Sequence, residues 1–266
     1  MRTRTLSLCV LACAAFFYTG TQTNAALVTL TDLNSSVQIE TDAQKGMFVW
    51  SVDGVDHLCQ QWFWYRIGDQ GPETSIDALG PAAVSQVTPR YVTTLYTAAG
   101  AFSIQVDYLL TGGTAGSRTS DIAESIRFIN LSGGVLPLRF FQYVNFDLNG
   151  VPGGDYAQLV NANTMAQWKP GVVLTETESV DTPAGKYYDV AYFPQTLNEL
   201  NDQLPTTLHN VAGPIGPGDV TWALEWVCDI PVGGTVLISK DKRITPEPMT
   251  LALLALGGLS LRRGRR

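Results

Sequence analysis

The sequence predicts an all-β protein, an antiparallel β-sandwich of jelly-roll-like type with one short helix. Apolar and polar residues alternate along most of its 266 residues, which is the period expected of strands that bury one face. Groups of Gly, Pro, Asn and Asp separate these alternating runs, as turns do. The crossover helices that a parallel α/β fold needs are missing from the pattern. Two antiparallel sheets packed face to face are the simplest way to bury so many one-sided strands.

The strongest strand pattern covers residues 222–230, where Trp, Leu, Trp, Cys and Ile occupy every second position. A Gly-rich turn follows, so we expect residues 222–230 to form a hairpin with residues 235–240. By the same reasoning, residues 123–131 are expected to pair with residues 136–148. The second of these partners is too aromatic to be left exposed to solvent.

Further strands are expected wherever an alternating run lies between turn residues. They cover residues 47–52, 60–67, 102–110, 165–168, 172–177 and 186–193. The one helix that the pattern supports is short and covers residues 195–202. Thr196 and Glu199 have the spacing of an N-terminal capping box for this helix.

The N-terminal residues have the layout of a secretory signal peptide. Two arginines precede a mostly apolar stretch, residues 6–18, and Thr23 and Ala25 place small residues at the −3 and −1 positions. We therefore expect residues 1–25 to form an export signal helix that is removed after Ala25. The folded body is expected to span residues 26–243.

The charge of the body limits its partners. Leaving out the two arginines of the signal and the four at the C-terminus, residues 26–248 contain 11 of the 17 basic side chains and all 24 acidic ones, a net charge of −13. Such a body repels phosphate groups rather than neutralising them. We therefore do not expect nucleic acid or anionic lipid to be its main partner.

The C-terminal residues have three parts with separate physical roles. Pro246 and Pro248 flank Glu247 and keep the backbone extended, which should hold this motif out of any sheet or helix. Residues 249–261 are uncharged and, as a helix, would be about 20 Å long, which is short for a hydrocarbon core of about 30 Å and suits transient membrane contact. Four arginines then close the chain and are expected to stay on the cytoplasmic side. The residues assigned to insertion are Leu251, Leu253, Leu254, Leu256, Leu259 and Leu261, and those assigned to orientation are Arg262, Arg263, Arg265 and Arg266.

The order of Pro-Glu-Pro, apolar stretch and basic end resembles the PEP-CTERM sorting signal of exported bacterial proteins. The resemblance implies that residues 244–266 are a sorting tail, which a membrane-embedded exosortase recognises and removes at or near Pro246, Glu247 and Pro248. It also implies delivery to the cell envelope, the outer surface or the extracellular space. Segments of the body are similar to exported PEP-CTERM proteins of planctomycete-type bacteria, but this second resemblance implies no activity. These segments are residues 53–66, 141–147, 216–222 and 239–242.

Four consecutive aromatic residues, 62–65, stand out within the body. On a strand, Trp62 and Trp64 would share one face. The more common use of such residues is core packing between sheets. The alternative is an exposed platform on which Trp62 and Trp64 stack against the sugar rings of an extracellular polysaccharide.

Two cysteines remain in the body once the export signal is removed. Cys59 and Cys228 would then lie in a compartment that permits a disulfide, and we expect a bridge between them. The alternative is two separate buried thiols.

A metal site has weak support in the sequence. Asp147, Asn149 and Asp155 place oxygen atoms on a Gly-rich turn, as a calcium-binding loop of a sandwich does. Turns also favour Asp and Asn for backbone reasons alone, so the same residues fit an ordinary loop. The His and Cys spacings of zinc sites are missing, and we expect no cofactor.

Catalytic motifs are also missing. His57 and His209 are the only two histidines, neither lies in the context of a Ser-His-Asp triad, and both are expected in turns or at the surface. Paired carboxylates for glycoside hydrolysis cannot be identified from their order in a sequence. We therefore expect an exported, noncatalytic structural or adhesive component of the extracellular matrix. A carbohydrate-binding module is the alternative, followed by a polysaccharide-active enzyme.

Overall fold

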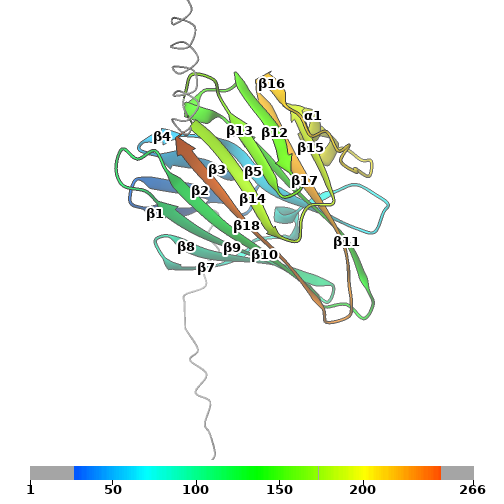
Figure 1. Ribbon diagram of the computed structural model, residues 1–266. Helices are drawn as coiled ribbons and strands as arrows, with labels where there is room; N and C mark the ends of the chain where they lie inside the picture. The colour runs from blue at the N-terminus through cyan, green and yellow to red at the C-terminus, as the bar shows by residue number, and fades with distance from the viewer. Residues whose placement is uncertain (1–26, 173, 247–266) are drawn as a thin grey trace, which may run out of the picture.

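A computed structural model describes residues 27–172 and 174–246, which form an antiparallel β-sandwich with one short helix, as predicted (Figure 1). Eighteen strands make up two sheets of nine strands each. The expected export signal helix, residues 1–25, and the apolar C-terminal helix lie outside the described residues.

The first sheet, called sheet I, is mostly antiparallel, with one short parallel contact between its third and fourth strands in the order below. Its main order is β1 (Leu27–Asp32), β2 (Ser35–Glu40), β3 (Gly46–Val52), β5 (Leu58–Ile67), β11 (Leu136–Phe146), β17 (Val220–Ile230) and β15 (Tyr187–Tyr192). The short strands β4 (Val55–Asp56) and β6 (Thr74–Ser75) pair with β3 and β5.

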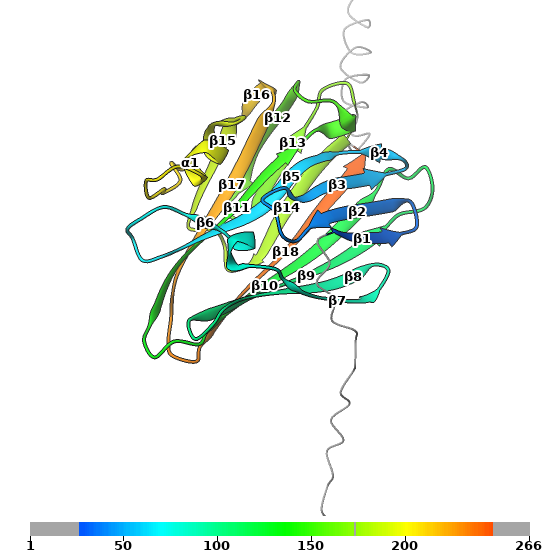
Figure 2. The ribbon, with the colours of Figure 1, turned by 180° about the vertical axis from the view of Figure 1, so that it is seen from behind.

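The second sheet, called sheet II, packs across the core from sheet I, and Figure 2 shows the sandwich from behind. Its order is β16 (Ile215–Gly218), β12 (Asp155–Asn161), β13 (Thr164–Trp168), β14 (Leu174–Thr182), β18 (Thr235–Pro246), β10 (Ser120–Asn130), β9 (Phe102–Gly112), β8 (Tyr91–Ala98) and β7 (Ala83–Thr88). Three short elements complete the fold: α1 (Gln195–Leu200) and the 3-10 turns η1 (Ile76–Leu79) and η2 (Leu148–Gly150).

Both hairpins predicted from the Gly-rich turns are wrong, because each pair of strands crosses from one sheet to the other. β10 pairs with β18 in sheet II, whereas β11 pairs with β17 in sheet I. The two crossing loops lie side by side at one end of the sandwich in both views (Figures 1 and 2). Asn130 joins them, since its Nδ2 donates to the carbonyls of Gly134 at 2.7 Å and Ile230 at 2.9 Å. Alternation defines the buried face of a strand, but it does not say whether the next strand lies beside it or opposite it.

The predicted short helix is present, but its capping box is not. α1 begins at Gln195 after Pro194, so Thr196 is already inside the helix and cannot act as the N-cap. The side chain of Thr196 is buried, and its hydroxyl has no hydrogen-bond partner among the described residues. Glu199 is directed toward the loop that follows α1 rather than toward the helix start.

Aromatic rings fill much of the space between the sheets. Phe140 of β11 stacks on Phe63 of β5 at 5.4 Å and meets Phe128 of the opposite sheet edge-to-face at 4.7 Å. Such offset and edge-to-face arrangements add to the stability that burial of the rings provides. The even-numbered residues of β11 therefore face the core, and the odd-numbered ones face away from sheet II.

A group of five buried charged side chains also lies between the sheets, all of them on sheet II. The group, called the inner charge cluster, consists of Glu124, Glu176, Glu178, Lys240 and Lys242. Lys240 and Lys242 both contact the Glu124 carboxylate, and Lys240 lies 3.5 Å from Glu178. Burial opposes the ionisation of Glu124, but the two lysines outweigh it and hold its pKa at about 2. The alternating pattern of β14 and β18 gave no sign that charged residues point inward.

The last described strand extends past the predicted domain boundary at residue 243. β18 continues to Pro246, and its final residues Thr245 and Pro246 pair with Thr175 and Leu174 of β14. The prediction that the Pro-Glu-Pro motif stays wholly outside the sheet is therefore wrong at its first residue. Pro246 is tolerated because only β14 flanks β18 there, since the pairing with β10 stops at Ile244.

Candidate functional site

The face of sheet I that points away from sheet II combines aromatic and charged side chains. Odd-numbered residues of β11 contribute Arg139, Phe141 and Tyr143, and the register places Trp64 of β5 and Glu225 of β17 on either side of Phe141. Trp64 meets Tyr143 edge-to-face at 6.3 Å. This surface is called the outer face. Despite its polar groups it is not open to solvent, since Trp64, Phe141, Tyr143 and Glu225 are all buried.

Residues 194–211, called the cover segment, lie over this face. Three carboxylates beneath it accept hydrogen bonds from its backbone. Glu73 accepts from the N–H of Thr206 at 2.9 Å, and Glu225 accepts from that of Leu208 at 3.0 Å. Asp189 of β15 accepts from the N–H groups of His209 at 2.8 Å and Val211 at 3.1 Å. The cover segment is thus held by side-chain carboxylates along its second half rather than by a sheet ladder.

Two arginines balance the charge of the deeper carboxylates. Arg66 contacts Glu73 and donates to the Thr206 carbonyl at 2.9 Å, while Arg139 donates to Glu225 at 2.6 Å. Burial raises the pKa of both Glu73 and Glu225 above the usual value, and the arginines together with the backbone N–H groups act in the opposite direction. The hydrogen bonds and the arginines thus favour the charged form of each carboxylate, against the effect of burial.

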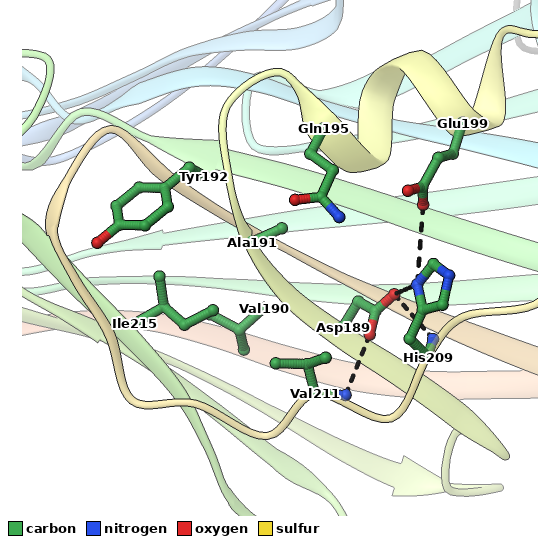
Figure 3. A pocket seen from close by; sticks show the side chains of 9 residues that line it. All are labelled: Asp189, Val190, Ala191, Tyr192, Gln195, Glu199, His209, Val211 and Ile215. Atoms are coloured by element: carbon green, nitrogen blue, oxygen red, sulfur yellow. Dashed lines mark hydrogen bonds and ion pairs between the residues drawn. The ribbon is translucent and has the colours of Figure 1, made fainter.

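At the edge of the covered face a pocket of about 220 Å³ remains between β15, α1 and the end of the cover segment. Figure 3 shows Gln195 and Glu199 reaching from α1 toward Asp189 and His209. His209 Nδ1 lies 2.8 Å from Asp189 Oδ2 and 3.9 Å from Glu199 Oε2. A ring nitrogen of His209 and one carboxylate oxygen each of Asp189 and Glu199 all lie within 4.8 Å of one another.

The electrostatics of this pocket centre on His209. Its hydrogen bond to Asp189 raises the pKa of the imidazole above the usual value, with Glu199 adding to the effect. Asp189 is 4% exposed and Glu199 29%, whereas His209 is 56% exposed and open to solutes. An imidazole and two carboxylates can bind a divalent cation, or they can transfer a proton to or from a bound molecule.

The structure removes the exposed-platform interpretation of the two tryptophans. Trp62 is 1% exposed and Trp64 0%. Trp62 donates through its indole nitrogen to Ser75 at 3.0 Å, and Trp64 donates to Asn201 of the cover segment at 3.2 Å. Gly46 of β3, with φ of 58°, approaches Trp62 so closely that a Cβ there would lie 2.1 Å from the ring. Both residues serve packing, which was the more common use expected from the sequence.

The predicted disulfide is wrong. Cys59 is an exposed free thiol and Cys228 a partly exposed one. They lie on β5 and β17, on opposite sides of β11, with Cys228 opposite Leu138 and Cys59 next to the partner of Asn145. Seven residues along β11 separate those positions by about 23 Å, far more than a disulfide spans.

Of the oxygen donors considered for calcium, the Asp155 carboxylate is already used by the fold. Asp155 is buried and accepts hydrogen bonds from Leu148 at 3.3 Å and Gln167 at 3.0 Å, and burial raises its pKa to about 6. The ammonium of Lys169 lies 3.4 Å from its other oxygen and thereby occupies the position a cation would take. Asn149 uses its backbone N–H to bond His57, and Asp147 donates its own N–H to the His57 carbonyl.

The prediction for the two histidines is half right. His209 lies at the surface, as expected, but His57 is 2% exposed. Burial lowers the pKa of His57 to about 4, so the ring is neutral and its Nδ1 accepts the Asn149 N–H at 2.9 Å. The grouping of Asp189, Glu199 and His209 was missed. Ten-residue spacings between them match no motif, and only the path of the cover segment brings them together.

Of the residues assigned to sorting, the structure describes only Pro246. Glu247, Pro248, the six tail leucines and the four terminal arginines lie outside the described residues. Within residues 27–172 and 174–246, none of the helices has the length and apolar character needed to cross a bilayer.

Comparisons with known proteins find solved structures of similar fold but no matching family. Neither the protein-family models nor the curated proteins include a match to this sequence. Among solved structures, the chain resembles a bacterial glucoamylase complexed with acarbose, with a TM-score of 0.58 and 10% identity over 93% of this chain. It also resembles a putative aldose 1-epimerase from Escherichia coli K12, with a TM-score of 0.54 and 10% identity over 83% of the chain. A protein from Synechocystis sp. PCC 6803 has a TM-score of 0.55 and 10% identity over 88% of the chain.

The extent of these matches differs between the neighbours. The chain spans only 36% of the glucoamylase, but it covers 99% of the epimerase and 100% of the Synechocystis protein. The structural neighbours therefore share the architecture of a large two-sheet sandwich. At such low identity, the likeness concerns the fold alone.

Proposed function

We propose that this chain is an exported protein of the cell envelope or extracellular matrix, sorted by an exosortase through its C-terminal Pro-Glu-Pro signal. The observation that carries this proposal is the end of β18. Its last residue, Pro246, pairs with β14 and is also the first residue of the motif. A cut just after the motif would therefore leave every described strand intact.

The body delivered in this way is a noncatalytic structural or adhesive domain. In support, the outer face of sheet I is filled by its own chain, with Glu73, Glu225 and Asp189 holding the cover segment by its backbone. Glu73 and Glu225, which accept both a backbone N–H group and an arginine, are committed to structure.

The sorting part is tested in an exosortase-containing host with the full chain, Glu247→Ala, and a chain lacking the last four arginines. We expect the full chain to reach the envelope or medium without residues 249–266, and both variants to accumulate unprocessed in the membrane fraction. Ser260→Ala, a tail change outside the motif and the basic end, is the matched control and should behave like the full chain. Unchanged processing of Glu247→Ala would exclude recognition through this motif.

A second candidate is carbohydrate binding at the pocket beside α1. Tyr192, which is 48% exposed, lines this pocket together with Asp189 and Glu199, and sugars bind by stacking on aromatic rings beside carboxylates. Two of the structural neighbours are named for sugar chemistry, a glucoamylase and a putative aldose 1-epimerase. Glycan-array binding that is lost in Tyr192→Ala would support this candidate, whereas binding that survives the change would place the sugar elsewhere.

A further inference from the structure

The pocket beside α1 draws its three ligand-type side chains from three different elements. Asp189 comes from β15, Glu199 from α1 and His209 from the loop after α1 (Figure 3). Two of the three belong to the cover segment and one to sheet I. Anything that binds all three would therefore tie the cover segment to the sheet.

The distances fit a small divalent metal ion. Zinc binds imidazole nitrogen and carboxylate oxygen at about 2.0–2.2 Å, which in a tetrahedral site places ligand atoms about 3.4 Å apart. The observed separations from His209 Nδ1, 2.8 Å to Asp189 and 3.9 Å to Glu199, lie on either side of that value. The three ligand atoms all lie within 4.8 Å of one another, so movements of the partly exposed Glu199 and exposed His209 side chains can bring them to that spacing.

The contacts of the three groups leave room for an ion. Asp189 is held in place by the N–H groups of His209 and Val211, so one ligand is already fixed. Glu199 Oε2 is buried, and within the described chain it has no hydrogen-bond partner although it faces the imidazole. A dication would neutralise the two carboxylates, with His209 neutral and bound through Nδ1.

We propose that Asp189, Glu199 and His209 form a binding site for a first-row divalent metal ion of the zinc class. Imidazole nitrogen favours such metals over calcium, which prefers oxygen ligands throughout. Gln195 lies one helical turn before Glu199 on α1 and lines the same pocket, so its side-chain oxygen or a solvent molecule can serve as the fourth ligand. The bound ion fastens the cover segment over the outer face.

The test titrates Zn²⁺ into the metal-stripped, untagged full-length protein by calorimetry, with Co²⁺ as a spectroscopic probe. We expect one Zn²⁺ per chain and Co²⁺ absorption bands of a nitrogen- and oxygen-ligated site. Glu199→Gln and His209→Gln should each weaken Zn²⁺ binding at least tenfold and abolish the Co²⁺ bands. Both residues are partly exposed and support no backbone group in the described chain, so the variants should fold, which circular dichroism checks.

The matched control is Asp202→Asn, which removes a carboxylate from the same cover segment. Among the described residues Asp202 accepts only the Leu204 N–H, and an asparagine can still do so, so binding should stay within twofold of the parent protein. The proposal is overturned if Zn²⁺ fails to bind stoichiometrically, or if all variants bind it equally, as adventitious binding to an acidic surface would. Calcium binding that depends equally on Glu199 and His209 would overturn the metal class.

Discussion

Glu225 of β17 joins the backbone of the cover segment to sheet I through its two oxygens. Oε1 accepts the guanidinium of Arg139 at 2.6 Å, and Oε2 accepts the N–H of Leu208 at 3.0 Å. The carboxylate is fully buried, so within the part of the chain that the structure describes its charge is satisfied by these two partners. Glu225 is thus the middle one of the three carboxylates that hold residues 206–211 against the outer face.

Replacing Glu225 by glutamine should loosen the cover segment. The change removes the charge that pairs with Arg139 and weakens the bond to Leu208, so we expect a loss of about 2 kcal/mol in the free energy of unfolding. Hydrogen exchange at Leu208 should also become faster. Asp229→Asn on the same strand is exposed and should change stability by less than about 0.5 kcal/mol. Unaltered exchange at Leu208 in Glu225→Gln would show that the carboxylate does not hold the segment.

The inner charge cluster predicts a large penalty for breaking one of its pairs. Lys240→Met should lower the free energy of unfolding by about 3–5 kcal/mol, because it leaves Glu124 and Glu178 buried with one counter-charge fewer. Arg243→Gln breaks an ion pair with Asp121 on the same strand pair, where the arginine is 64% exposed. Its effect should stay below about 1 kcal/mol. Equal losses in the two variants, measured by urea unfolding, would contradict the buried pairing.

Glu176 gives the inner charge cluster a pH dependence with a definite sign. Burial and the neighbouring Glu178 raise the pKa of Glu176 well above its usual value, and neither of its oxygens has a hydrogen-bond partner within the described part of the chain. Above about pH 4.5 the unfolded chain releases this proton while the folded protein keeps it, so the folded state loses stability as pH rises.

Glu176→Gln removes this proton release. The free energy of unfolding of the variant should therefore rise relative to that of the parent protein, by up to about 1.4 kcal/mol per pH unit above 4.5. Unfolding curves of the two proteins between pH 4.5 and 8 measure the difference. A stability difference that stays flat across this range would mean that Glu176 is ionised in the folded protein.

Burial of the aromatic cluster predicts a stability effect for Trp64. Trp64→Ala should reduce the free energy of unfolding by about 3–5 kcal/mol, since it opens a cavity between the outer face and the cover segment. Tyr192→Ala, at a half-exposed ring, should cost roughly 1 kcal/mol. Thermal or urea unfolding distinguishes them, and a Trp64→Ala protein as stable as its parent would indicate an exposed ring.

The alternating pattern predicted the sandwich and most strands. A strand that buries one face has an alternating sequence whichever strands lie beside it. It could not predict which strands pair. The Gly-rich loops after β10 and β17 suit a hairpin as well as a crossing between sheets, and only the pairing of β10 with β18 and of β11 with β17 reveals the crossing. The bridge expected between Cys59 and Cys228 was based on a compartment that permits disulfides, and the sequence does not give the distance between the two residues.

The candidate site was harder to predict because it depends on the cover segment. Residues 201–214 have no strand or helix pattern, so their path over sheet I follows from the bonds that Glu73, Glu225 and Asp189 make with their backbone. The burial of charged side chains was equally hard to predict from the sequence, because Lys240 and Lys242 occupy strand positions that are normally apolar.

The sorting proposal depends on where the mature chain ends, and its intact mass measures this most directly. Protein recovered from the envelope or medium of an exosortase-containing host should begin after Ala25 and end at or near Pro246, Glu247 and Pro248, with β18 complete. A mass that still includes residues 249–266 would contradict exosortase processing, and so would a cut inside β18.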